Sequence, residues 1–561
     1  MKTIYTPYIC ILFFLLTTFF SNAQSLELDL KTVSKTNTYI LKNLNYKKIQ
    51  NSKNELLNEI NNIKIKLSYQ GFLNAEIDSI TIKGNKYTAY LNLGKPVEYI
   101  EIKYDKPINL KILKKYTEIY NDSIFKIKFA FVEPLLNNLS NYFETQGNSF
   151  TQLKLKNIRF KNNKATAALL ILKSKPRFIT NVIIKNYKTF PKTFLKYYLN
   201  IKKNDVFNKA KIKSISKRLK YLNFVSEIKP AEVLFTKNKT NVYLYLKKNK
   251  TNSVDGLLGF SSKENKSGLL FNGYLNLNLV NAFNTGETLS LLFKSNGLSQ
   301  QKFKIGAKLP YVFNSKFTLN TQLNIYKQDS SYININANLA MQYPINYNNN
   351  IGITFKHQSS TNLLTNKLGN IIDYNTNFFG LNYQYNPFND NSLNFNKTLS
   401  IQANALVGTK KNDQIKTNQY LLELTASYML PFNYRNAIFI KSKSAFLSSD
   451  SYLTNELFRI GGFNSIRGFK EESIFASKYS ILNVEYRYKT GLASYLYSIT
   501  DFGFIINPFL PKNLNLYSIG IGYKFLVKTG FFNLSYVLGK TSNEPLKISN
   551  SLININIRTL F

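Results

Sequence analysis

Residue types that often build chemical sites are nearly missing from this 561-residue sequence. Tryptophan is absent, and histidine and cysteine occur once each, as His357 and Cys10. One residue of each type cannot form a disulfide or a metal site of histidine and cysteine ligands. No second histidine or cysteine accompanies His357, which also argues against a catalytic triad. We therefore expect no enzyme activity, no metal ion and no cofactor.

Acidic residues are few compared with basic ones. The 74 lysines and arginines outnumber the 31 aspartates and glutamates, which gives a formal net charge of +43. Such a charge is typical of nucleic-acid-binding proteins, but the lysines are spread along the chain and no nucleic-acid-binding motif accompanies them. The abundance of Lys, Asn, Ile, Tyr and Phe instead indicates an AT-rich coding bias. We expect no nucleic-acid partner, whereas contact with acidic headgroups or sugars is favoured.

Long apolar runs are missing beyond the N-terminus. The run Tyr8–Phe20 follows Lys2 and precedes the small residues of Ser21–Ala23. This order is typical of a secretory signal peptide, so we expect residues 1–23 to be removed by cleavage after Ala23 and the chain to be exported. No other window approaches 18 apolar residues, which excludes membrane-spanning helices and leaves a closed barrel as the way to cross a membrane.

The first half of the exported chain contains a repeat. The segment Gly94–Tyr104, "GKPVEYIEIKY", is answered 80 residues later by the Lys-Pro pair and strand of Ser174–Tyr187. Each repeat reads as a strand, two helices and two further strands, which predicts a small α+β module. The expected boundaries are 24–95, 96–175 and 176–250 for three modules, and 251–561 for the region that follows.

The strands of these modules alternate apolar and polar residues, as in "KLKNIRF" at 154–160. Alternation predicts a sheet with one face covered by helices and one face in water. An open edge of such a sheet can pair with an incoming strand through its main chain. The sequence leaves open whether the modules capture other chains or only act as spacers, because it does not reveal which edges are exposed.

From residue 251 onward the pattern changes to strand after strand of strict alternation. Ser315–Gln328 places apolar residues on one face and Thr, Asn and Gln on the other. This pattern is typical of a transmembrane β-barrel, although a soluble sandwich alternates in the same way. The 311 residues accommodate about 16 antiparallel strands, and the chain ends on a strand, which favours the barrel. The apolar face of that last strand carries Ile553, Ile555, Ile557 and Phe561.

A glycine-rich segment late in the chain carries a resemblance. "GGFNSIRGF" at Gly461–Phe469 resembles the loop signature of the BamA/TamA-type outer-membrane insertase and translocator superfamily, with Ile466 in place of the usual Val. The resemblance implies periplasmic POTRA modules, a sixteen-stranded barrel and a loop folded back into the barrel lumen. In that loop the arginine pairs with acidic residues of later strands, which match Glu485 and Asp501 here. The implied loop residues are Gly461, Gly462, Phe463, Arg467, Gly468 and Phe469.

The strand register bears on these two acceptors. Asn483, Glu485 and Arg487 share one face of a predicted strand, so Glu485 is expected to point into the lumen. The direction of Asp501 is left open, because Tyr497 and Ile499 share its face in a regular strand, whereas an intervening bulge would separate them. If both carboxylates reach Arg467, that side chain acts as a latch on the loop.

The resemblance also implies a function and a location. The three-module layout resembles most closely the Tam-type translocation factor in the outer membrane of a diderm bacterium, with the modules in the periplasm. Modules of that kind would capture unfolded outer-membrane or secreted client proteins and pass them to a seam between the first and last barrel strands. Expected partners are these clients, outer-membrane lipid and periplasmic accessory proteins. The alternatives are a two-partner-type secretion pore, which usually has fewer modules, and a passive channel; a secreted adhesin fits least.

Overall fold

The chain folds as two compact units, residues 1–178 with 206–209 and residues 179–205 with 210–561. The computed structural model describes residues 25–32, 40–41, 44–104, 110–120, 123–161, 164–262, 269–296, 300–364, 370–385, 395–412, 415–527 and 530–561. The predicted signal peptide and its cleavage site lie outside these ranges. Within them, no helix is both long and apolar enough to cross a membrane.

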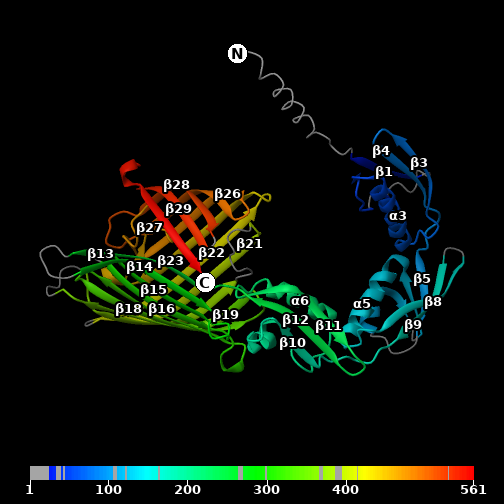
Figure 1. Ribbon diagram of the computed structural model, residues 1–561, viewed down its shortest axis with the longest axis horizontal. Coiled ribbons are helices and arrows are strands. Elements are labelled where there is room, and N and C mark those ends of the chain that lie inside the picture. The colour runs from blue at the N-terminus through cyan, green and yellow to red at the C-terminus, as the bar shows by residue number, and fades with distance from the viewer. Residues whose placement is uncertain are drawn as a thin grey trace, which may run out of the picture. The chain divides into compact units, whose positions relative to one another are not determined.

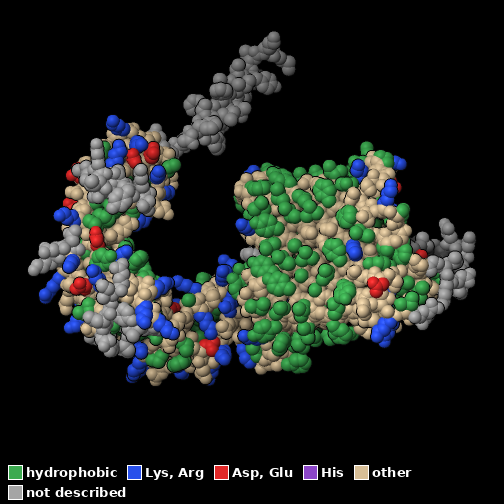
Figure 2. Space-filling view, turned by 180° about the vertical axis from the view of Figure 1, so that it is seen from behind, with side chains coloured by type: hydrophobic (Ala, Val, Ile, Leu, Met, Phe, Trp, Pro, Cys, Tyr) green, Lys and Arg blue, Asp and Glu red, His purple; other side chains and the backbone are tan. Residues whose placement is uncertain are grey.

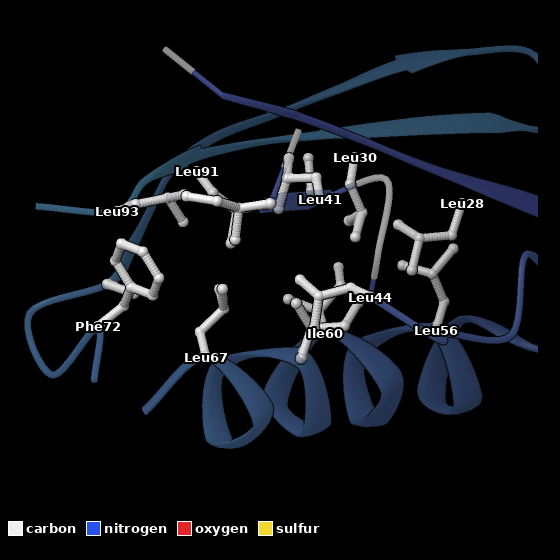
Figure 3. Close-up of a cluster of buried hydrophobic side chains, with 14 residues drawn as sticks. Leu28, Leu30, Leu41, Leu44, Leu56, Ile60, Leu67, Phe72, Leu91 and Leu93 are labelled. Atoms are coloured by element: carbon white, nitrogen blue, oxygen red, sulfur yellow. The ribbon is translucent and has the colours of Figure 1, made fainter. Parts of the chain in front are cut away.

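The first module packs helix α3 (Lys53–Tyr69) against a four-stranded sheet (Figures 1 and 3). The helix begins after Ser52, whose hydroxyl accepts a hydrogen bond from the N–H of Glu55 at 3.2 Å, as expected of an N-cap. Its buried face repeats every three to four residues and meets the leucines of the sheet. These helical residues are Leu56, Ile60, Ile63 and Leu67. The sheet order is β2-β1-β4-β3, with β1 (Leu26–Thr32), β2 (Ile49–Gln50), β3 (Glu76–Lys83) and β4 (Lys86–Asn92).

The second module repeats this plan in the same unit. Helix α5 (Val132–Thr145) buries Val132, Leu135 and Leu139, at helical spacing, against the inner face of a five-stranded sheet. The first helix is reduced to α4 (Leu110–Leu113). The sheet order is β6-β7-β5-β9-β8, with β5 (Tyr99–Tyr104), β6 (Thr117–Tyr120), β7 (Ile124–Lys128), β8 (Gln152–Lys161) and β9 (Lys164–Leu172).

The third module has a three-stranded sheet, and most of it belongs to the unit that contains the barrel. Its two helical segments are the π-helical turn η4 (Phe194–Tyr198) and helix α6 (Lys209–Leu219). The sheet order is β10-β12-β11, with β10 (Asn181–Lys185), β11 (Val225–Phe235) and β12 (Thr240–Lys248). In each module the first strand runs parallel to the last one.

The longest edge strand of each module is irregular. The pairing register shifts between Ile77 and Ser79 in β3, between Lys156 and Arg159 in β8, and twice in β11. Bulges of this kind blunt an exposed sheet edge against pairing with another strand. The predicted open edges are therefore interrupted in all three modules.

The rest of the chain forms a closed antiparallel barrel of sixteen strands, which confirms the predicted fold class (Figure 1). The strands follow one another around the barrel in chain order. They are β13 (Ser253–Ser262), β14 (Leu269–Val280), β15 (Thr288–Asn296), β16 (Gln300–Leu309), β17 (Thr318–Gln328), β18 (Tyr332–Pro344), β19 (Asn349–Asn362), β20 (Tyr374–Tyr385), β21 (Thr398–Lys411), β22 (Lys416–Pro431), β23 (Asn436–Ser449), β26 (Lys478–Gly491), β27 (Ser494–Ile506), β28 (Leu514–Val527), β29 (Gly530–Thr541) and β30 (Leu552–Leu560).

The two faces of the barrel wall differ as the alternation predicts. Ile353, Phe379, Leu381 and Leu422 are each more than half exposed on the outside, and hydrophobic side chains cover much of the visible barrel surface (Figure 2). Residues of the opposite parity, such as Asn382, are buried in the lumen. An apolar outer wall with a polar interior is suited to lipid. The barrel wall therefore has the two faces of a membrane-spanning β-barrel.

The seam between the first and last strands is short. Among the described residues, β13 and β30 pair only through Ser253 with Leu560 and Val254 with Thr559, and the N–H of Phe561 adds a bond of 2.9 Å to the carbonyl oxygen of Asn252. By contrast, β13 and β14 pair over ten residues and β29 and β30 over eight. The last strand points its isoleucines outward, with Ile553, Ile555 and Ile557 at least half exposed and Phe561 48% exposed.

Candidate functional site

A long loop between β23 and β26 folds into the barrel lumen, and we call residues 450–477 the lumen loop. Its first part contains the short helical turn η6 (Thr454–Glu456). Its sides pair as a small two-stranded sheet of β24 (Phe458–Ile460) and β25 (Ile474–Ala476). The glycine and arginine signature lies at the tip of this hairpin.

Arg467 meets both predicted acceptors inside the lumen. Its Nη1 donates to Glu485 Oε1 at 2.5 Å, while Nε and Nη2 donate to the two oxygens of Asp501 at 2.9 and 2.5 Å. The backbone N–H of Arg467 donates to Asp501 as well, at 3.0 Å. The three side chains are almost fully buried, with 5%, 7% and 0% of their surfaces exposed for Arg467, Glu485 and Asp501. The bidentate pairing fixes the guanidinium in one orientation.

A second arginine balances the charge of this site. Arg487 donates from Nε to Glu485 at 2.8 Å, and its guanidinium stacks over the ring of Phe439 at 4.1 Å. Two arginines thus face two carboxylates in a space with little access to water, where an unpaired charge would be costly. We call Arg467, Arg487, Glu485 and Asp501 the arginine anchor. Its role as a latch stays a prediction.

Apolar packing and a close backbone approach complete this anchor. Ile466, which stands where the superfamily usually has Val, is fully buried beside Ile481 and Leu516. Gly468 has a φ of 82°, and a side chain there would lie 2.8 Å from the backbone nitrogen of Gly539 on β29. Only glycine suits that position without strain. The structure also describes the remaining signature residues. Gly461 and Gly462 have positive φ. Phe469 packs against the apolar cluster, and Phe463 is half-buried.

The open question of Asp501 is settled by the strand that carries it. β27 pairs with β28 in a continuous register from Ser494 to Ile505, so no bulge separates Asp501 from Tyr497 and Ile499. All three side chains are buried inside the barrel. The strand stays regular because this part of the lumen contains apolar side chains, against which Tyr497 and Ile499 pack. The alternation of apolar and polar residues along a strand does not reveal that apolar side chains also pack inside the barrel.

Sequence reasoning missed a second buried contact of the lumen loop. Lys410 of β21 donates to Glu456 Oε1 at 2.9 Å, and their side chains are 1% and 2% exposed. The amide of Gln419 donates to the other oxygen of Glu456 at 3.0 Å. Asn455 next to it is also buried and donates to the hydroxyl of Ser360 at 2.7 Å. The sequence did contain a sign of this contact. Lys410 lies on the lumen-facing side of β21, and a buried lysine needs an acidic partner.

A polar cavity of about 510 Å³ lies beside the loop in the lumen. Amide side chains of β17, β18, β19 and β21 are the most common residue type in its wall, which also includes Lys302, Arg459 and Glu472. The amide residues that line it are Gln322, Asn324, Asn334, Asn336, Asn338, Gln358, Gln402 and Asn404. The lumen is therefore not filled on this side.

The third module packs on the turns at the periplasmic end of the barrel. The ring of Phe194 meets Tyr311 edge to face, with 4.9 Å between centroids, and Tyr221 stacks on Tyr347 at 5.6 Å. Gly286 is required there, because a side chain would lie 2.0 Å from the ring of Phe194. Three turns of the barrel, at residues 281–287, 310–317 and 345–348, thus hold one module in place.

Two tyrosine hydroxyls of the third module form hydrogen bonds, one to a barrel turn and one within the module. Asn281 donates to the hydroxyl oxygen of Tyr187 at 2.5 Å, and Tyr198 donates to the carbonyl oxygen of Arg218 at 3.2 Å. Burial raises the pKa of Tyr198, although the charge of Arg218 opposes this shift. The hydroxyl therefore stays protonated at physiological pH and keeps its role as a donor.

Comparison with known proteins agrees with this architecture. Residues 309–525 match the family model of the haemolysin secretion/activation proteins ShlB, FhaC and HecB. No curated protein matches the sequence. CdiB from Escherichia coli has a TM-score of 0.54 at 12% identity, covering 90% of this chain and 97% of that chain.

Two further solved structures are similar. CdiB from Acinetobacter baumannii has a TM-score of 0.52 at 14% identity, over 82% of this chain and 89% of that chain. BamA from Haemophilus ducreyi lacking POTRA domains 1–3 has a TM-score of 0.45 at 13% identity, over 82% of this chain and 99% of that chain. The likeness to both CdiB structures confirms the predicted fold, small α+β modules before a sixteen-strand barrel. The narrower Tam-type resemblance stays a prediction.

Proposed function

We propose that this outer-membrane barrel is a two-partner-type secretion pore that exports client polypeptides through its lumen. The match of residues 309–525 to haemolysin secretion/activation proteins carries the proposal. This reading takes the place of the Tam-type function expected first from the sequence. Export of this kind makes and breaks no covalent bond, so we assign no enzyme activity and no cofactor.

The geometry of the lumen supports a pore with a movable obstruction. The lumen loop crosses from the wall at Lys410 to the wall at Asp501 and is held at both places by buried ion pairs. A polar cavity remains beside it. A polypeptide can use this lumen only after the loop shifts, so the loop would act as the gate of the pore.

One observation favours a second candidate, insertion of clients into the membrane. The two-pair seam between β13 and β30 leaves most backbone groups of both strands without a partner from the other strand. Such groups can template an incoming strand. In this mechanism the seam opens sideways, whereas in export the lumen opens along its axis.

A reversible lock on the seam separates the two candidates. Cysteines at Val254 and Thr559, which lie opposite each other across the seam, would form a disulfide under oxidising conditions. Cys10 is the only native cysteine, so no thiol in the predicted mature chain competes. The locked protein, a single-cysteine Val254→Cys control and the wild type would each be returned to cells that lack the gene.

The readout is the set of polypeptides in the culture medium, quantified by mass spectrometry, together with the outer-membrane proteome. Export through the lumen predicts that wild type and locked protein restore the same extracellular polypeptides. If the lock instead lowered the folded outer-membrane barrels, and reduction restored them, insertion at the seam would be the function. Absence of any extracellular polypeptide that depends on the protein would refute the export proposal.

The modules are assigned the capture of clients, and their bulged edges limit how they do it. Because β3, β8 and β11 are interrupted, main-chain pairing is confined to short stretches, and side chains must contribute the rest.

Deletion of residues 25–175 removes the first two modules and leaves the third module on the barrel. Capture predicts that the shortened protein inserts in the membrane but exports little; unchanged export would reduce these modules to spacers.

A further inference from the structure

Lysines gather on the lumen side of the barrel wall opposite the tip of the loop. Lys294 of β15 and Lys302 of β16 lie side by side in the register of these strands, and Lys304 follows with the same parity. On β23, Lys441 and Lys443 lie opposite Asn483 and Ile481, which face the lumen. We call these residues the lysine cluster: Lys294, Lys302, Lys304, Lys441 and Lys443.

Four of the lysines form one electrostatic group, and Lys294 lies beside one of them, Lys302, in the strand register. Lys302 and Lys443 both act on the charge of Lys304, and Lys441 and Lys302 act on Lys443. Among the described residues, no carboxylate forms an ion pair with Lys304 or Lys443. Three glutamates, Glu423, Glu471 and Glu472, act on these five lysines, so the lysines of the cluster outnumber these carboxylates.

The tip of the lumen loop places two glutamates on this cluster. Glu471 lies 3.4 Å from Lys294. Glu472 pairs with Lys302 and lies 3.9 Å from Nε of Arg459. The lysine side chains are 41% and 25% exposed in these pairs, in contrast to the fully enclosed arginine anchor. A short acidic peptide, supplied by the protein itself, therefore already occupies part of the cluster.

Two features indicate that this contact is replaceable. Glu472 has a φ of 52°, a conformation that is unfavourable for a residue with a side chain. Exposed ion pairs contribute little to stability, because water and salt screen them. Movement of the tip away from the lysines would relieve the backbone strain and lose only weak contacts.

The neighbouring cavity offers room for a different chain. It begins at Lys302 and Glu472 and continues along the amide side chains. The side-chain oxygens of Asn324 and Asn338 are buried there without a hydrogen-bond partner among the described residues. Amides both donate and accept, so they can satisfy the main chain of an extended peptide whatever its sequence.

We propose that the lysine cluster binds an acidic, extended segment of the transported polypeptide, which displaces Glu471 and Glu472 from it. The identification of the ligand as a transported chain rests on the export function proposed above. The binding chemistry itself rests on the lysines, the glutamates and the cavity. Exchange of one acidic segment for another would couple arrival of the client to movement of the loop.

Binding is measured on the purified full-length protein in detergent with a fluorescein-labelled octaglutamate peptide, by fluorescence anisotropy. Octaglutamine serves as the uncharged comparison. We expect Lys302→Gln with Lys443→Gln to weaken octaglutamate binding about tenfold. We expect Glu471→Gln with Glu472→Gln to tighten it about threefold to tenfold, because the internal competitor is gone.

The matched control is Lys512→Gln with Lys547→Gln, which removes two exposed lysines outside the barrel strands. It should leave binding unchanged. Equal loss in this control, equal binding of octaglutamine, or no tightening in the glutamate variant would each overturn the proposal. The binding assay requires no export, so the two proposals can fail separately. If octaglutamate does not bind but secretion is intact, the binding role of the lysine cluster is refuted. If octaglutamate binds but no polypeptide is exported, the export function is refuted.

Discussion

The lumen loop is held in two very different ways at two regions of the barrel. At the arginine anchor, four charges balance in a site where Asp501 has no exposed surface and an apolar cluster closes around Ile466. At the lysine cluster, two partly exposed glutamates, 39% and 18% exposed, meet a larger number of lysines beside a cavity. Burial makes the first contact costly to break, whereas solvent and surplus charge make the second one exchangeable. Release of the loop should therefore begin at the lysine cluster.

The largest effect is expected from breaking the arginine anchor. Arg467→Met removes three side-chain hydrogen bonds to two carboxylates and leaves Asp501 charged and buried. Loss of one partner of such a pair costs about 3–5 kcal/mol. The measurement is the temperature at which the folded barrel loses its heat-modifiable migration in a detergent gel, compared between variant and wild type.

The double variant Arg467→Met with Asp501→Asn is the control for this effect. It removes the unpaired charge, while Glu485 keeps Arg487 as its partner. The double variant should recover part of the lost stability. If Arg467→Met alone left the transition unchanged, the anchor would contribute nothing and the contrast between the two regions would be wrong.

The pair of Lys410 and Glu456 should give a somewhat smaller effect. Its side chains are as buried as those of the arginine anchor, but Gln419 and the N–H of Leu453 also satisfy Glu456. Lys410→Met is expected to destabilise the barrel by about 3 kcal/mol, and the further change Glu456→Gln should restore part of this. Denaturant unfolding followed by tyrosine fluorescence measures both. If Lys410→Met cost less stability than loss of the pairs at the lysine cluster, the contact of Lys410 with Glu456 would be as exchangeable as those pairs.

The smallest effect on stability is expected at the lysine cluster. Glu472→Gln removes the pairs with Lys302 and Arg459, which are partly exposed, so the loss should be below about 1 kcal/mol. When the same assay is repeated at high salt, the free energy of unfolding of the variant should hardly change, because the pairs that salt would screen are already absent. A loss comparable to that of Arg467→Met would show that this contact is as fixed as the anchor.

The sequence by itself determined the layers of this molecule and, through the resemblance, three of the four residues of the anchor. Alternation over residues 251–561 predicts a barrel wall, because inside and outside positions repeat every two residues. The parity of Glu485 predicts its direction for the same reason. The glycine and arginine signature names Arg467, because its resemblance to a superfamily loop carries information that periodicity lacks.

Tertiary structure alone decided which distant residues share the lumen. Lys410 and Glu456 are far from the signature, and the lysine cluster joins strands β15, β16 and β23 across the barrel. The direction of Asp501 also depended on closure, because an enclosed interior accepts apolar side chains such as Ile499 that an alternating pattern assigns to lipid. Local sequence fixes which side of a strand a residue takes. Only the closed ring of strands fixes what lies opposite it.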